Sequence, residues 1–138
     1  MLTADQARAF LATRHRGVFT TFRADGRPQL SPVLAALDGA GRVVLSTTEG
    51  RAKARNVRRD PRVALCVMED GFFGSWVQVE GTAELLPPEE ALDEEALRGL
   101  YGALPATEPP SWDEFRAAVA APERVVVRFA IERASGVV

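Results

Sequence analysis

Cysteine, histidine and lysine are almost absent from this sequence, and the first two scarcities each exclude a kind of site. The single cysteine, Cys66, cannot form an internal disulfide, and it lies in an apolar run that is typical of a buried strand. His15 is the only histidine, and it has no cysteine beside it, whereas a metal site needs several ligands. The sequence therefore predicts neither a structural disulfide nor a metal centre.

Long apolar runs are also missing. No stretch approaches the ~20 consecutive apolar residues that a membrane-spanning helix needs, and the first ten residues mix acidic and basic side chains, unlike a signal peptide. We therefore expect a cytoplasmic protein with no membrane partner. The chain has 138 residues, of which 46% are hydrophobic and 26% charged, and this suits one domain with its own core.

Basic residues are unevenly distributed along the chain. The net charge is −2, which argues against a nucleic-acid partner, yet six of the 17 basic residues fall between Arg51 and Arg62. The one lysine of the chain, Lys53, lies inside this segment. Because its compact ammonium differs from the planar guanidinium of arginine, a lone lysine there indicates either a specific role or chance survival in an arginine-rich sequence. A local cationic segment in a mildly acidic protein suits a compact anion.

Period-two patterns and turn signals predict a mainly β protein with peripheral helices. Strands are expected over residues 18–23, 27–37, 42–47, 62–69, 76–85 and 124–133. Helices are expected over residues 4–14, where Thr3 and Gln6 have the form of a capping box, and over residues 51–60, 89–104 and 111–121. Asp25-Gly26 is a hairpin-turn signal. Pro28 and Pro32 place the second strand at a sheet edge or a bulge, because proline cannot donate to the ladder. Hairpin connections dominate, which favours an antiparallel sheet closed into a small barrel over a parallel α/β sheet.

The junction between the third strand and the second helix is typical of an anion site. Residues 46–53 pass from a strand end into a helix N-terminus, where free N–H groups and the positive end of the helix dipole are available. Thr47 and Thr48 add hydroxyl donors, and Arg51 and Lys53 add charge. The alternative is a solvated helical face of regularly spaced arginines, namely Arg51, Arg55, Arg58 and Arg62.

No catalytic motif accompanies this junction. The sequence contains no nucleophile elbow, no P-loop and no dinucleotide-binding glycine pattern. An enzyme without evident acid–base groups can take its chemistry from a cofactor.

Four blocks of the sequence resemble the pyridoxamine 5'-phosphate oxidase-like split-barrel superfamily in order and spacing. They cover residues 25–33 (DGRPQLSPV), 46–56 (STTEGRAKARN), 59–65 (RDPRVAL) and 79–85 (VEGTAEL). Within the superfamily, the chain looks most like the actinobacterial branch that uses the deazaflavin coenzyme F420. The resemblance implies a six-stranded antiparallel split β-barrel of the FMN-binding type. It also implies a homodimer with a cofactor in each of two grooves at the interface.

The resemblance further implies roles for nine residues. The ring or ribityl region of the cofactor would be lined by Ser31, Pro32 and Val33. Ser46 and Thr47 would contact the ring of the cofactor or the upper part of the cofactor's own side chain. The phosphate would be held by Arg51, Lys53 and Asn56. The partner's cofactor would be reached by Trp76.

The implied activity is hydride transfer from reduced F420 to an electron-poor double bond of a small organic substrate. An FMN-dependent oxidoreductase of the same fold is one alternative, and a non-catalytic binder of a flavin, deazaflavin or tetrapyrrole is another. Two departures argue against vitamin B6 oxidation. Ala52 replaces a second basic residue before the lysine, and residues 132–138 contain neither tryptophan nor histidine, whereas such oxidases end in a tryptophan- and arginine-rich segment.

Overall fold

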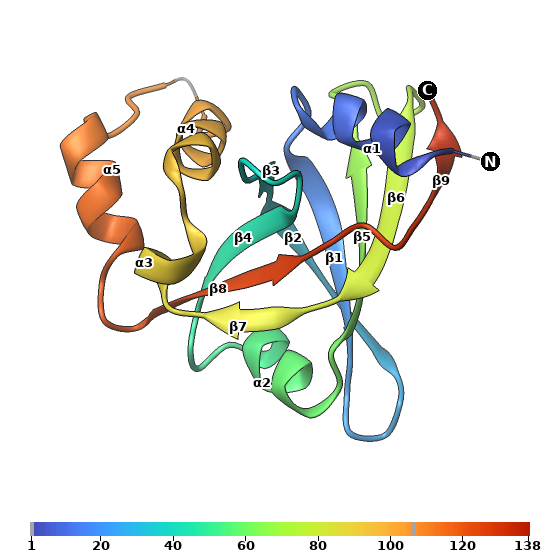
Figure 1. Cartoon of the computed structure of the whole chain (residues 1–138), viewed down its shortest axis with the longest axis horizontal. Helices are drawn as coiled ribbons and strands as arrows, with labels where there is room; N and C mark the ends of the chain where they lie inside the picture. The colour runs from blue at the N-terminus through green and yellow to red at the C-terminus, as the bar shows by residue number, and fades with distance from the viewer. Residues whose placement is uncertain (1, 106) are drawn as a thin grey trace.

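The computed structural model describes residues 2–105 and 107–138 (Figure 1). Within these residues, five helices and nine strands follow one another along the chain. In order, they are α1 (Ala4–Leu11), β1 (Arg16–Phe22), β2 (Pro28–Leu34), β3 (Ala36–Leu37), β4 (Val43–Thr48), α2 (Ala52–Arg59), β5 (Arg62–Met68), β6 (Trp76–Thr82), β7 (Glu84–Leu86), α3 (Pro88–Ala91), α4 (Glu94–Gly102), α5 (Trp112–Val119), β8 (Arg124–Phe129) and β9 (Arg133–Val137). The prediction of a mainly β chain with peripheral helices is confirmed.

The strands form two antiparallel sheets instead of one closed barrel. One sheet has the order β2-β1-β5-β6-β9, and the other has the order β3-β4-β8-β7. The prediction of six strands is wrong. The predicted strands over residues 27–37 and 76–85 are each broken in two, and β9 lies almost entirely beyond the predicted strand over residues 124–133. In each of the successive pairs β2 and β3, β6 and β7, and β8 and β9, one strand belongs to each sheet.

The breaks occur where a strand leaves one sheet for the other. The N–H of Ala35 donates to the carbonyl of His15, and the N–H of Ala83 donates to the carbonyl of Pro61, so the ladder changes partner at these residues. A Cβ at Gly81 would lie only 2.4 Å from the carbonyl oxygen of Ala130, which shows how closely two of the switching strands approach. Strands that switch sheets in this way build the corners between packed sheets.

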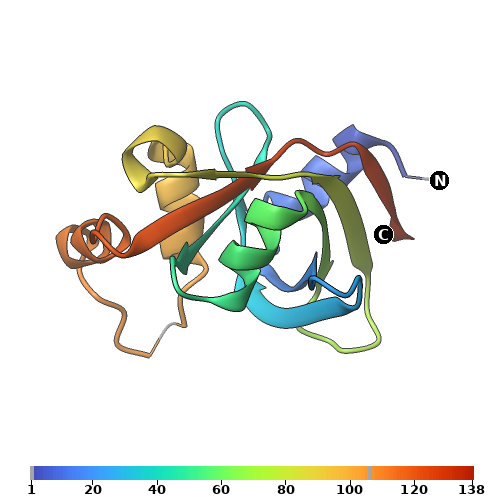
Figure 2. The same cartoon turned by 90° about the horizontal axis from the view of Figure 1, so that it is seen from below.

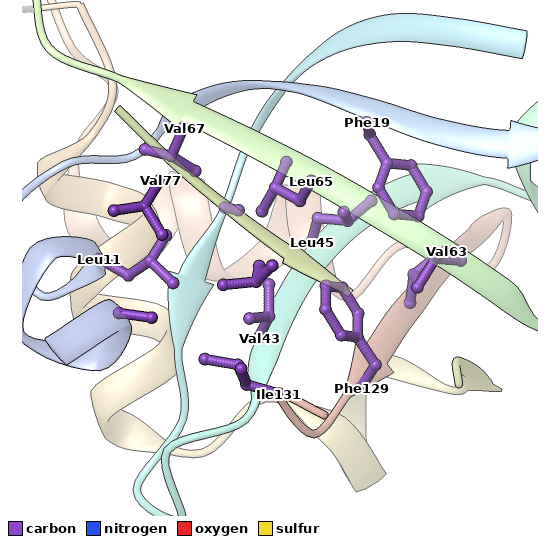
Figure 3. Packing of buried hydrophobic residues seen from close by; sticks show 14 of the residues in the cluster. Leu11, Phe19, Val43, Leu45, Val63, Leu65, Val67, Val77, Phe129 and Ile131 are labelled. Atoms are coloured by element: carbon purple, nitrogen blue, oxygen red, sulfur yellow. The ribbon is translucent and has the colours of Figure 1, made fainter. Parts of the chain in front are cut away.

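Apolar side chains from the two sheets meet between them and form the main core (Figure 3). Phe19 and Leu65 extend from the five-stranded sheet, and Leu45 and Phe129 from the other; all four are at most 1% exposed. Helices α1 and α2 pack at opposite ends of this core, as Figures 1 and 2 show. The burial of these large side chains is the dominant favourable contribution to folding.

A second apolar cluster covers the outer face of the four-stranded sheet. Val44 and Val126 point from β4 and β8 toward α3, α4 and α5, where Leu100 and Phe115 pack on them. The expected helix over residues 89–104 is in fact two helices, because Leu92 is extended and Asp93 starts a new helix by accepting a hydrogen bond from the N–H of Ala96 at 2.9 Å.

Several local predictions are confirmed. Thr3 and Gln6 form the capping box that opens α1, although this helix ends at Leu11 rather than at residue 14. Gly26 has a φ of 85°, as the predicted hairpin turn requires. β2, which carries two prolines, is an edge strand of its sheet. No helix within the described residues has the length and apolarity needed to cross a bilayer.

Candidate cofactor site

Two adjoining hollows lie along β2, where this edge strand contacts β4 without pairing with it. The larger hollow has a volume of about 600 Å³ and is lined mostly by apolar groups of β1, β2 and β5 and by Phe72, with the charged residues Arg16, Glu69 and Asp70 also in its lining. The smaller has a volume of about 280 Å³ and contains Ser46, Lys53 and Arg124. Residues 32–34 line both hollows, so the two adjoin along β2, and together they are called the depression below.

The smaller hollow has one apolar wall and one cationic end. The wall is supplied by α4 and α5 and consists of Leu100, Leu104, Phe115 and Val119. The cationic end lies where β4 leads into α2 and carries Lys53 and Arg124. Such a combination suits a ligand with a flat apolar portion joined to an anionic group.

Lys53 lies in the first turn of α2, and the N-cap residue Arg51, just before the helix, provides no side-chain cap. Within the described residues, neither of these two cations has a carboxylate partner, although Lys53 is half-buried. Burial, and then the neighbouring charge of Arg51, lower the pKa of the Lys53 ammonium. Two adjacent cations and uncapped N–H groups form a site that a bound anion would stabilise.

The other basic residues of the segment have partners within the chain. Arg58 pairs with Glu49, and Arg62 pairs with Asp60 at 2.7 Å, which lowers the pKa of the Asp60 carboxyl to about 2. Backbone carbonyls accept from two more arginines, Arg55 and Arg59. The expected arginine stripe is not one helical face, because α2 ends at Arg59 and Arg62 belongs to β5.

The structure brings four of the nine predicted site residues to these hollows. They are Pro32, Val33, Ser46 and Lys53. Ser31 directly precedes Pro32 on β2 but lines neither hollow, and its buried hydroxyl has no hydrogen-bond partner within the described residues. An orphaned buried hydroxyl is unusual in a folded protein and indicates a missing ligand or water.

The other predicted site residues lie elsewhere. Thr47 alternates with Ser46 and is buried with the main-core face of β4. Asn56 is only 6% exposed, donates from Nδ2 to Thr21 Oγ1 at 3.0 Å and accepts from Arg59 at 2.8 Å. Arg51 is exposed beside the smaller hollow without lining it.

Trp76 lies on the five-stranded sheet, outside both hollows. It begins β6 in register with Met68, which lines the larger hollow, and it is 37% exposed. Its side chain is therefore placed beside the depression rather than within it.

Arg124 is the site residue that sequence reasoning missed. It begins β8 opposite Thr48, and its Nε and Nη2 donate to Ser46 Oγ at 3.1 and 2.7 Å. Its Nη1 donates to Thr48 Oγ1 at 3.3 Å. Ser46 and Arg124 are 78 residues apart, so only the pairing of β4 with β8 could have revealed this contact.

The chain is similar to known proteins over almost its whole length. The family model described as pyridoxamine 5'-phosphate oxidase matches residues 3–137. The F420H(2)-dependent biliverdin reductase of Mycobacterium tuberculosis (strain CDC 1551 / Oshkosh) is 31% identical over 134 residues, which are 96% of this chain and 87% of that protein.

Solved structures are also similar. A conserved hypothetical protein from Mycobacterium tuberculosis superposes with a TM-score of 0.76 and 27% identity, over 99% of this chain and 85% of that one. A structure named F420 reductase superposes with a TM-score of 0.66 and 27% identity, over 93% of this chain and 94% of that one.

Proposed function

We propose that this chain, which belongs to the pyridoxamine 5'-phosphate oxidase family, is an oxidoreductase that uses reduced F420 to transfer hydride to a small organic substrate. The observation that carries the proposal is Lys53, which has no carboxylate partner among the described residues and lies with Arg124 at the cationic end of a hollow whose wall is apolar. Relatives named for F420 support this cofactor.

The residues present fit such a cofactor. F420 joins a flat deazaflavin ring and a ribityl chain to a phosphate with a glutamate tail. Lys53 has no carboxylate partner among the described residues and would hold the phosphate. The orphaned hydroxyl of Ser31 would bond to a polar atom of the ring or ribityl chain. The larger hollow, of about 600 Å³, leaves room for an apolar ring and for substrate.

When bound, F420 supplies a hydride, and its carbon-for-nitrogen replacement favours two-electron transfer over reaction with oxygen. The protein's own residues would bind the cofactor and orient it. Lys53 and Arg51 neutralise the tail, while Pro32 and Val33 offer an apolar edge that keeps water from one side of the site. A fixed cofactor beside an open apolar hollow places a planar substrate within reach of the ring.

For the substrate, we propose a conjugated molecule with an electron-poor double bond. One relative is named for biliverdin, an open-chain tetrapyrrole, and the apolar larger hollow suits such a molecule. A non-catalytic tetrapyrrole carrier would use the same hollow. FMN is the alternative cofactor, since a lysine that binds one phosphate serves both.

We also propose a homodimer in the cytoplasm. The outer face of the five-stranded sheet carries exposed apolar side chains, among them Leu30 at 57% and Val137 at 61% exposed, and Trp76 lies on the same sheet. A second copy would bury this face and bring Trp76 close to the partner's site. Light scattering on the purified protein measures the mass, and a monomer at micromolar concentration would contradict the dimer.

The proposed function is tested by binding and then by turnover. The purified, folded protein is titrated with F420 and with FMN, and oxidation of reduced F420 is followed with biliverdin, quinones and activated alkenes. We expect F420 to bind and at least one conjugated substrate to be reduced. Binding of FMN alone would favour the flavin alternative, and F420 binding without turnover would favour a carrier. Failure of both cofactors to bind would refute the proposal.

A further inference from the structure

We infer that Arg124 is a second cationic anchor, beside Lys53, for the anionic group that binds in the smaller hollow. The inference rests on the proposed function and adds a residue from a distant strand to the expected phosphate site. Register places Arg124 there, because it pairs with Thr48, the last residue of β4 before the chain turns into α2. Lys53 and Arg124 line the same hollow.

Two hydroxyls fix the orientation of the Arg124 side chain. Ser46 accepts from Nε and Nη2, and Thr48 accepts from Nη1. A guanidinium has five N–H donors. The three bonds to hydroxyls therefore leave about two of them, one on each terminal nitrogen, for another acceptor. The side chain is half-buried, so its position is held by the protein before any ligand arrives.

The charge of Arg124 is not compensated by these bonds. Its acceptors are neutral hydroxyls, and within the described residues no carboxylate forms an ion pair with it. Arg128, on the same face of β8, is the contrast, because it pairs with Glu84 at 2.9 Å. Arg128 therefore contributes an ion pair to the folded protein, whereas the charge of Arg124 is available to a ligand.

Two cations that have no carboxylate partner among the described residues line one hollow of about 280 Å³, so an anion in that hollow would be attracted to both. A phosphate accepts from both, since a guanidinium can donate two parallel bonds and an ammonium acts as a point charge. Ser46 adds a further donor. Its oxygen accepts from Arg124, which leaves its own O–H free to donate into the hollow.

The test compares Arg124→Gln with the matched control Arg128→Gln. Each variant removes one positive charge from the same strand face, but only Arg124 lines the smaller hollow. Affinity is measured by titration with F420, with FMN and with the deazaflavin ribityl fragment that lacks the phosphate. We expect Arg124→Gln to weaken F420 and FMN binding about 10- to 100-fold and to leave fragment binding within about twofold, as loss of a charge-assisted bond predicts. Arg128→Gln should not change any of the three affinities.

The variant Ser46→Ala distinguishes direct binding of the phosphate by Arg124 from the positioning of Arg124 by Ser46. It removes the oxygen that orients Arg124, so we expect the affinity for the phosphate ligands to fall by less than in Arg124→Gln. Equal losses for the fragment and for F420 in Arg124→Gln would mean a structural role and would overturn the inference, as would no loss at all.

A separate measurement tests the role of Arg124 even if the proposed cofactors do not bind. If wild-type protein binds neither F420 nor FMN, thermal unfolding is measured with inorganic pyrophosphate. Stabilisation of the wild type but not of Arg124→Gln would retain Arg124 as an anion anchor. Equal or absent stabilisation in the two proteins would overturn it.

Discussion

Helix α2 carries basic side chains at both ends, and the two ends differ in what those side chains contact. At its C-terminal end, Arg58 pairs with Glu49, and Arg59 donates to the carbonyl of Phe22. At its N-terminal end, Lys53 has no ion-pair partner within the described residues. Residues of the same charge a few positions apart therefore stabilise the fold at one end and remain available for a ligand at the other.

The difference arises from what lies around each end. Helix α2 packs on β1 and β7, and near its C-terminus Arg59 reaches the carbonyl of Phe22 on β1, while Arg58 reaches Glu49 in the turn before the helix. The N-terminal half faces the smaller hollow, which offers an apolar wall and neutral hydroxyls. The spacing of charges along the helix does not show which basic side chains have a partner in the protein, whereas the hydrogen bonds and ion pairs of the structure do.

The largest expected effect comes from removing the ammonium group of Lys53. Lys53→Ala should weaken F420 binding by about 1–3 kcal/mol, because a charge-assisted bond to the phosphate is lost. The free energy of unfolding should hardly change, since Lys53 has no ion-pair partner within the described residues. Fluorescence titration measures the first quantity and urea denaturation the second.

The control for this prediction is Arg58→Ala. It removes a cation from the same helix, but one that already pairs with Glu49. Cofactor affinity should be retained. If both variants lost affinity equally, the general positive field of the helix would be responsible and the two ends would not differ.

Asn56→Ala should show the opposite pattern. Its amide bonds to Thr21 and Arg59 inside the protein, so the variant leaves the buried Thr21 hydroxyl without its partner. We expect a loss of about 1–3 kcal/mol in the free energy of unfolding and an unchanged cofactor affinity, by the same two measurements. A loss of affinity at unchanged stability would instead support the phosphate role that the family resemblance implies for Asn56.

A smaller effect is expected in the pH dependence of binding. Burial and Arg51 lower the pKa of Lys53 from its usual 10.5, and the anion binds the charged form. Affinity should therefore be full below this lowered pKa and fall as the pH rises through it. Lys53→Arg should abolish this alkaline fall, because a guanidinium stays protonated. Binding of the phosphate-free fragment corrects for titration of the ring, and an identical fall in both proteins would contradict the assignment.

Local features of the chain could be predicted from its sequence. Capping residues, the Asp25-Gly26 turn and the edge position of β2 follow from the chemistry of single residues and their neighbours. Lys53 could be placed near a helix N-terminus for the same reason, because a strand end and a helix start lie within a few residues of it; its role in binding an anion stays a prediction.

Long-range features could not be predicted in this way. The strand breaks depend on close approaches such as Gly81 to Ala130, which join distant segments. Asn56 looked like a ligand residue, but its side chain turns inward to Thr21, 35 residues away. Arg124 looked like an ordinary strand start until the pairing of β8 with β4 placed it beside Ser46.

The sharing of three strands between the two sheets has a consequence for how the molecule opens. Neither sheet can separate without pulling apart strands that also belong to the other, so we expect amide protons of both sheets to exchange with solvent in one cooperative step. Helices α4 and α5 stand outside this unit, because their cluster covers only the outer face of the four-stranded sheet. We therefore expect the amide protons of α4 and α5 to exchange separately from those of the two sheets.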